Sequence, residues 1–214
     1  NMPTVITFVS PAQRLSRAFN HVGQNSMKIF SSSGSVLCGH QHCCHCVRNI
    51  AYYRMGFVNE DGSGALKQHT QFGATVNGNM LDIAVLEWCK LFADRNAVHH
   101  WKRVIRDDTE RQRFLGDMLQ DAATSPNDWK RYLDTVRVYR DKFVAHLDDL
   151  DEMHTPSLAI ALKCVLFLYA HIRSNFPAST LTMPGRAPLP EDLSTYYGDC
   201  LDEAHQAYAA GKGV

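Results

Sequence analysis

One segment of the chain, residues 158–169, is apolar on nearly every side of the helix that its composition predicts. Thr155 and Pro156 form a helix start ahead of it, and the sequence Asn-Phe-Pro at residues 175–177 ends the helix. Because a helix that is apolar all round has to be covered by other elements, we expect it at the buried centre of a helical bundle. The apolar run contains Lys163 and is shorter than the roughly 20 residues of a bilayer span, so no membrane association is expected.

Several other stretches show apolar residues spaced three and four positions apart, as amphipathic helices do. A short β-branched segment at residues 3–9 is too isolated to build a sheet. The chain is therefore predicted to be all-α, a bundle of about six helices. Besides the apolar helix, the predicted helices cover residues 11–22, 40–57, 80–94, 99–105, 107–123, 126–147 and 191–210.

Two interruptions are predicted between these helices. Ser31–Ser35 indicates a break, and residues 59–79, rich in Gly and Asn, indicate a long loop. The length of 214 residues fits one domain. The expected parts of this single domain, residues 1–214, are N-terminal helices and loop at 10–79, a core at 80–175 and a C-terminal helix at 190–211.

Charge and cysteine content limit where the protein acts and what it binds. Lys and Arg together number 22, as do Asp and Glu, so the net charge is zero and any RNA contact has to come from a local patch. The seven cysteines are an odd number, and Cys38, Cys43, Cys44 and Cys46 crowd together, unlike a secreted disulfide framework. Without an evident signal peptide, a reducing, cytoplasmic location is expected.

The clearest chemistry lies in the predicted helix 126–147, where Arg140 is followed by Asp141 and then, after four more residues, by His146. Arg binds phosphate through a planar fork of donors, and imidazole transfers protons near neutral pH. Together they meet the needs of phosphodiester cleavage without a metal. The alternative is that Arg140 is an ordinary surface residue and that His146 simply lies near the helix end.

The segment Tyr139–His146, with the sequence Tyr-Arg-Asp-Lys-Phe-Val-Ala-His, resembles the signature of the HEPN superfamily. That signature is an Arg, usually followed by a polar residue, with a His a few residues further on. The segment Leu86–Phe92, the Trp-containing helix after it and the apolar helix after the motif fit the same pattern. The similarity covers residues 80–173 and is to the AbiU-like branch, which is associated with abortive infection and toxin–antitoxin systems.

The resemblance implies a helical bundle that forms a homodimer, with the motifs of both chains facing one cleft. It implies a metal-independent endoribonuclease without a cofactor, with a toxin or phage-defence role. His146 would act as general acid–base, Arg140 would stabilise the pentacoordinate phosphate, and Asp141 would orient either side chain. The implied partners are RNA, a second copy of the chain and an antitoxin protein. Many HEPN proteins instead keep the fold and act as non-catalytic binding partners, which is a second hypothesis.

Helix geometry bears on how the motif would work. On a straight helix, Arg140 and His146 lie about 9 Å apart along the axis and about 120° apart around it. A dimer in which each chain offers both groups brings them to one phosphate more easily. Lys142 shares a face with His146, and Lys142 and Tyr139 are candidate substrate contacts. A solvated Lys and a packed Tyr are the alternatives.

A second cluster, Cys38–Cys46, holds seven potential metal ligands. Helical spacing puts Cys38, His42 and either His45 or Cys46 on one face, where they are weak candidates for zinc ligands. The second pair of ligands that zinc sites usually have is missing from the nearby sequence. The distant residues that would complete such a site are His69, His99 and His100.

The same cysteines and histidines also fit small, soft side chains packed in a helix interface, or a redox-sensitive site. A zinc-binding sensor or structural protein is therefore the third hypothesis, after RNA cleavage and non-catalytic binding. The chain offers no Gly-rich phosphate loop and no paired-carboxylate site of the kind that two-metal nucleases use.

Overall fold

The computed structural model describes residues 27–57, 70–145, 155–182 and 188–210. Within these ranges the chain forms seven α-helices and no strand, so the predicted all-α bundle is confirmed. The elements are α2 (Met27–Phe57), α3 (Gln71–Phe92), α4 (Trp101–Val104), α5 (Asp108–Asp121), α6 (Pro126–Tyr139), the π-helix η1 (Arg140–Ala145), α7 (Leu158–Asn175), the 3-10 helix η2 (Ala178–Thr180) and α8 (Leu193–Ala210).

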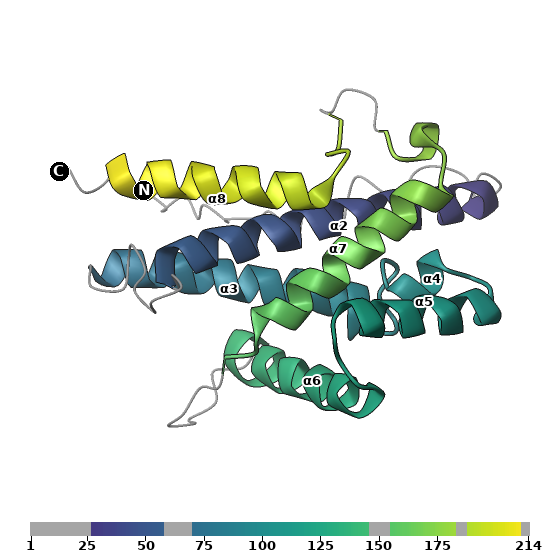
Figure 1. Ribbon diagram of the computed structural model, residues 1–214, viewed down its shortest axis with the longest axis horizontal. Coiled ribbons are helices and arrows are strands. Elements are labelled where there is room, and N and C mark those ends of the chain that lie inside the picture. The colour runs from purple at the N-terminus through teal and green to yellow at the C-terminus, as the bar shows by residue number, and fades with distance from the viewer. Residues whose placement is uncertain (1–26, 58–69, 146–154, 183–187, 211–214) are drawn as a thin grey trace, which may run out of the picture.

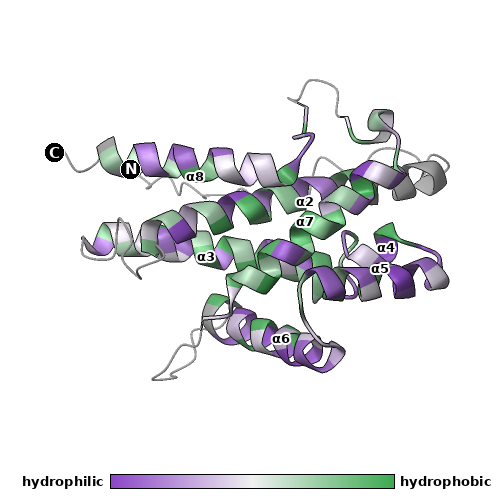
Figure 2. Ribbon diagram, in the orientation of Figure 1, coloured by the Kyte–Doolittle hydropathy of each residue, from purple (hydrophilic) through white to green (hydrophobic). Residues whose placement is uncertain are grey.

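The long helix α2 is the centre of the bundle. It packs along α3, along α8 and across α7, and the α2–α3 contact is the most extensive in the structure. Figure 1 shows α8, α2 and α3 running side by side, with α7 crossing α2 and α3 and with α5 and α6 below the crossing. Apolar residues gather where α2, α3 and α7 meet, whereas polar residues dominate α5 and the outer side of α6 (Figure 2).

The apolar helix α7 is packed in the bundle, though it is not the central helix that its composition predicts. It contacts α2, α5 and α8, and its side chains Cys164, Val165 and Leu168 are fully buried. Among the described residues it is the one helix long and apolar enough to cross a membrane, and 44% of that window is buried in the bundle. The core helix of a soluble protein has the same properties, because burial requires the same apolar residues.

Aromatic side chains join α3 to α6. The ring of Trp88 lies 5.1 Å from that of Phe92, and edge-on to Trp129 and Tyr132 at 5.7 and 5.4 Å between centroids. Such edge-to-face pairs add to the free energy gained from burying the rings. The apolar stripes predicted for residues 80–94 and 126–147 therefore face each other.

Of the two helix starts predicted from caps, one is confirmed and one is displaced. The side chain of Ser125 accepts a hydrogen bond from the Asp128 backbone N–H at 3.1 Å, with Pro126 in the first turn of α6. Helix α7 begins later than predicted, at Leu158 with Ser157 as its N-cap, so Thr155 is not the capping residue. The predicted segments at residues 3–9 and 11–22 lie outside the described residues.

Both predicted interruptions are wrong where the structure describes them. Helix α2 runs without a break through Ser31–Ser35, although each serine costs a helix a few tenths of a kcal/mol and Gly34 costs about 1 kcal/mol. Residues 71–79 of the predicted loop form the first turns of α3, which Thr70 caps by accepting from the Gly73 N–H at 3.3 Å. The remaining part of that predicted loop, residues 59–69, lies outside the described residues.

The start of α3 is helical because it packs closely on α2. Asn77 is fully buried, and its Nδ2 donates to the Tyr53 carbonyl oxygen at 3.3 Å. A Cβ atom on Gly56 would lie 2.7 Å from the Asn77 Cγ, closer than packed side chains come. The absence of a side chain at Gly56 thus leaves room for Asn77 between the two helices.

Gly56→Ala should lower the free energy of unfolding by about 1–2 kcal/mol, because the buried side chain of Asn77 has to shift and its hydrogen bond to the Tyr53 carbonyl oxygen is disturbed. The matched change Gly116→Ala lies in the exposed middle of α5 with nothing within 4 Å of the new Cβ. It should raise the free energy of unfolding by about 1 kcal/mol through helix propensity alone. Urea denaturation measures both, and a stabilising Gly56→Ala would contradict the tight α2–α3 contact.

Candidate functional site

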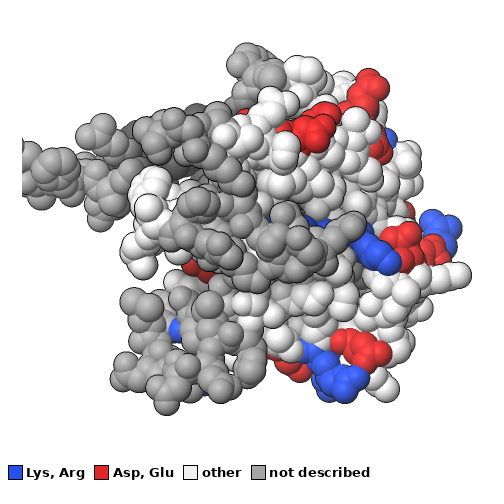
Figure 3. Space-filling view, turned by 60° about the vertical axis from the view of Figure 1, so that its left-hand side comes forward, with Lys and Arg blue, Asp and Glu red and all other residues white. Residues whose placement is uncertain are grey.

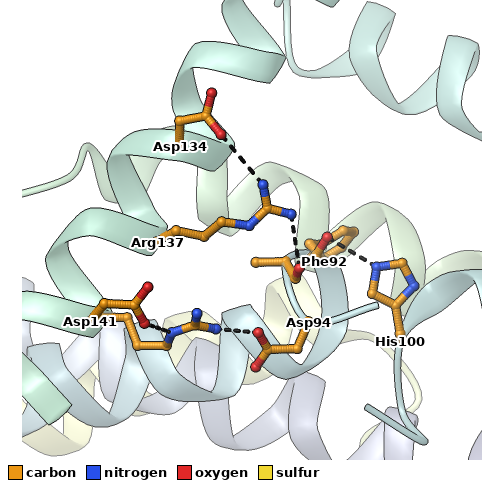
Figure 4. A network of polar contacts seen from close by, with 8 residues as sticks. Phe92, Asp94, His100, Asp134, Arg137 and Asp141 are labelled. Carbon is orange, nitrogen blue, oxygen red and sulfur yellow. Dashed lines mark hydrogen bonds and ion pairs between the residues drawn. The ribbon is translucent and has the colours of Figure 1, made fainter. Parts of the chain in front are cut away.

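The predicted motif begins where α6 changes from an α-helix to the π-helix η1 at Arg140. π-helical segments are rare and often lie at functional sites. The Arg140 Nε donates to Asp141 Oδ1 at 2.8 Å, and its Nη1 donates to Asp94, just beyond the end of α3. Figure 4 shows Asp141 and Asp94 on either side of this guanidinium. The expected neighbour Asp141 is thus bound to Arg140, and Asp94 joins it from a distant part of the chain.

Arg140 is held as a fixed cation near the surface. Its side chain is 19% exposed, against 38% for Asp94 and 57% for Asp141. The hydrogen bond to Asp141, with a second to Asp94, raises the pKa of Arg140 further above its usual value despite partial burial. The guanidinium stays charged, and two carboxylates fix the direction in which it points.

Arg137, one turn earlier on α6, binds the same end of α3. Its Nη2 donates to the Ala93 carbonyl oxygen at 2.9 Å, while its Nη1 reaches Asp134 at 3.4 Å. Both arginines thus place positive charge at the C-terminal end of α3, where the unpaired carbonyls favour it (Figure 4). Arg137 is therefore a packing residue that ties α6 to α3.

The other predicted motif residues are not gathered around Arg140. Tyr139 is 2% exposed, and its hydroxyl donates to Asp82 Oδ1 at 2.8 Å inside the bundle. Burial, and then the bond to Asp82, raise the pKa of Tyr139. Lys142 is half-buried on η1. His146, the predicted acid–base, lies outside the described residues, so the Arg–His pair stays a prediction.

The second cluster divides between two environments on α2. Cys43 and Cys46 are fully buried, and burial raises the pKa of both thiols well above the usual value. The Cys46 Sγ donates to the Ala84 carbonyl oxygen at 3.4 Å, so this predicted ligand points into the core. The side chain of Cys38 lies outside the described residues. The thiols described here are packed and protonated, which disfavours redox chemistry at them.

The histidines of the cluster lie instead at the edge of the α2–α3 interface. Single ligand atoms of His42, His45 and Glu87 all lie within 4.8 Å of one another. The His42 Nδ1 donates to Glu87, whose other carboxylate oxygen accepts from Lys90 at 2.9 Å. Burial acts to raise the pKa of Glu87, but the bonds from His42 and Lys90 outweigh it and lower the pKa to about 2.

The distant histidines named from the sequence fall in different places. His99 packs on His42, with ring centroids 4.2 Å apart. His100 is buried and serves the fold, since its Nε2 donates to the Phe92 carbonyl oxygen at 3.1 Å and its Nδ1 accepts from the Lys102 N–H. His69 lies outside the described residues. Sequence reasoning missed Glu87 and Asp94, because nothing in their local sequence links them to residues about 45 positions away.

Comparison of the chain with protein-family models, with curated proteins and with solved structures found no match. The similarity to HEPN proteins therefore depends on the motif and its surrounding pattern alone. The surface agrees with the zero net charge, because in Figure 3 basic side chains lie beside acidic ones over the part of this face that is described.

His40 belongs to the same helix but takes part in neither group of residues. It is fully buried and stacks on Tyr169 with ring centroids 3.9 Å apart. Neither of its ring nitrogens has a hydrogen-bond partner within the described ranges. Burial, with a smaller contribution from Arg173, lowers the pKa of His40 from 6.5 to about 4.

The free energy of unfolding should therefore fall as the pH drops from 6.5 to about 4. In that range His40 binds a proton in the unfolded chain and stays neutral in the folded chain. His40→Phe removes this contribution. As the pH drops through that window, the free energy of unfolding of the variant should rise relative to that of the wild type by about 1.4 kcal/mol per pH unit. Urea denaturation at a series of pH values measures the difference, with His205→Phe, on the exposed side of α8, as the matched control. Equal slopes for His40→Phe and the wild type would contradict a buried neutral His40.

Proposed function

We propose that the protein is a metal-independent endoribonuclease of the HEPN type that acts as a homodimer. The observation that supports this best is the fixed guanidinium of Arg140 at the start of η1, in the sequence context of the HEPN motif. Catalysis needs charge that is already in place before the reaction begins. Asp94 and Asp141 meet this need because they hold the positively charged guanidinium in one direction.

The remaining donors of Arg140 are the part that would meet RNA. Its bonds to the carboxylates use Nε and Nη1, and Nη2 has no hydrogen bond to any described residue. An Nη2 edge with two N–H groups can donate to a phosphate oxygen while the other side stays anchored. In the proposed reaction, Arg140 stabilises the extra negative charge on the pentacoordinate phosphate.

His146 would move the protons. In one role it accepts the proton of the ribose 2′-hydroxyl as that oxygen attacks the adjacent phosphorus, and in the other it protonates the leaving 5′-oxygen. The products would be a 2′,3′-cyclic phosphate and a free 5′-hydroxyl, because no water enters this step. One imidazole does not easily act as base and as acid in the same step. The His146 of a second chain would therefore take the second role, which is the reason to propose a dimer. A toxin or phage-defence role with an antitoxin partner follows from the resemblance alone.

The test is cleavage of total RNA in EDTA. Arg140→Ala and His146→Ala should each slow cleavage by about 100-fold or more, which is the scale of losing a charge stabiliser or an acid–base. The cleavage rate of Arg140→Lys should lie between the rates of these variants and that of the wild type, because lysine keeps the positive charge but lacks the planar fork of donors.

Arg131→Ala is the matched control, since this arginine lies on the same helix, pairs with Asp128 and is 80% exposed. It should cleave like the wild type. Circular dichroism checks that each variant is folded. Cleavage that survives in folded Arg140→Ala and His146→Ala proteins would refute the proposal.

A second candidate function is a non-catalytic HEPN-like dimer that binds a partner. It is favoured by the pairing of Arg140 with two carboxylates, because such a cation is already neutralised without RNA. On this view the arginine mainly ties α6 to α3. The wild-type protein would then sediment as a dimer and leave RNA intact, and Arg140→Ala would lower the melting temperature.

A further inference from the structure

We propose that His42, His45 and Glu87 form a binding site for zinc at the α2–α3 interface. This site is separate from the arginine motif and goes beyond RNA cleavage. Two histidines and one carboxylate are the protein ligands of a common class of zinc site, in which the fourth position is left open. His42 and His45 come from successive turns of α2, and Glu87 comes from α3.

The distances fit with small side-chain movements. One ligand atom from each residue lies within 4.8 Å of the other two. In a tetrahedral zinc site, bonds of about 2.1 Å place neighbouring ligand atoms about 3.4 Å apart. His45 is exposed, so its ring is free to change rotamer toward the other two ligands. The backbone already brings the three residues together, because α2 and α3 make the most extensive contact in the bundle.

The surroundings hold the carboxylate in place. The side chain of Glu87 is 12% exposed and that of His42 is 18% exposed. Lys90 donates to Oε1 of Glu87, which leaves Oε2 directed at His42. This is how a second layer of hydrogen bonds orients a metal-binding carboxylate. A zinc ion entering beside His45 would replace the contact between His42 and Glu87 with bonds from both residues to the metal.

His99 lies directly beside one of the three ligands. It lies between α3 and α4, and its ring packs on His42. Its Nδ1 is buried and has no hydrogen-bond partner within the described part of the chain. An unpaired buried polar atom is costly, and a bound ion or water is one way to satisfy it. The neighbouring His100, in contrast, uses both ring nitrogens in hydrogen bonds to the backbone.

The chemistry of the donors selects the metal. Two imidazoles with one carboxylate suit zinc and its first-row neighbours, whereas Mg²⁺ and Ca²⁺ need several oxygen ligands. Of the described thiols in the cluster, Cys43 is fully buried and Cys46 donates to the Ala84 carbonyl oxygen in the core, so neither is a ligand of this site. Because the ligands come from two helices, bound zinc would hold α2 to α3 and stabilise the folded protein.

The test is titration of chelator-treated, full-length protein with Zn²⁺ by calorimetry and with Co²⁺ by visible absorption. One equivalent should bind, zinc should raise the melting temperature, and cobalt should give tetrahedral bands without the charge-transfer band of a thiolate. His45→Ala and Glu87→Gln should each weaken zinc binding by about tenfold or more. His205→Ala, on the exposed side of α8, should bind like the wild type.

His45 is exposed, so His45→Ala is expected to fold normally even if Glu87→Gln does not. No binding by the wild type, or equal binding by folded His45→Ala and the wild type, would overturn the proposal. RNA cleavage by His45→Ala in EDTA separates this site from the arginine motif. The cleavage rate of His45→Ala should equal that of the wild type. A failure of the zinc proposal would therefore not affect the test of RNA cleavage.

Discussion

The close contact between α2 and α3 is the constraint on which the rest of the structure depends. It needs a residue without a side chain at Gly56, opposite the buried Asn77. The same contact places Glu87 of α3 next to His42 and His45 of α2. It also positions the C-terminal end of α3, which Arg137 and Arg140 bind through Ala93 and Asp94. Both groups of functional interest are therefore consequences of one helix pair, although they share no residue.

The properties of the sequence that depend on local spacing were predicted well. The stripes around Trp88 and Trp129 and the cap at Ser125 follow from periodicity and from hydrogen bonds within one helical turn. The failures have a tertiary cause. Residues 71–79 look like a loop because glycine and asparagine are weak helix formers, but packing on α2 through the buried Asn77 outweighs such small local costs. Ser31–Ser35 looks like a break for the same reason of low helix propensity, and α2 continues through it.

The same distinction applies to the candidate sites. Helical spacing correctly brought His42 and His45 together, because they are three residues apart on one helix. It had no means of finding Glu87 or Asp94, which meet their partners only after α3 packs against α2 and α6. It also grouped Cys46 with the histidines, since a helical wheel does not say which side of a shared stripe turns toward the core.

Arg140 shows why a short motif needs its surroundings before it has a chemical meaning. A guanidinium bound by Asp94 and Asp141 is well oriented, yet part of its charge is offset before any phosphate arrives. Since Asp94 and Asp141 are more exposed than the arginine, water screens them and weakens their hold on the cation. A phosphate that approaches through this screened surface would meet a pre-oriented donor edge at Nη2, while Nε and Nη1 stay bound to the carboxylates. In the proposed reaction the two carboxylates would orient the arginine and would not compete with the phosphate for its free donors.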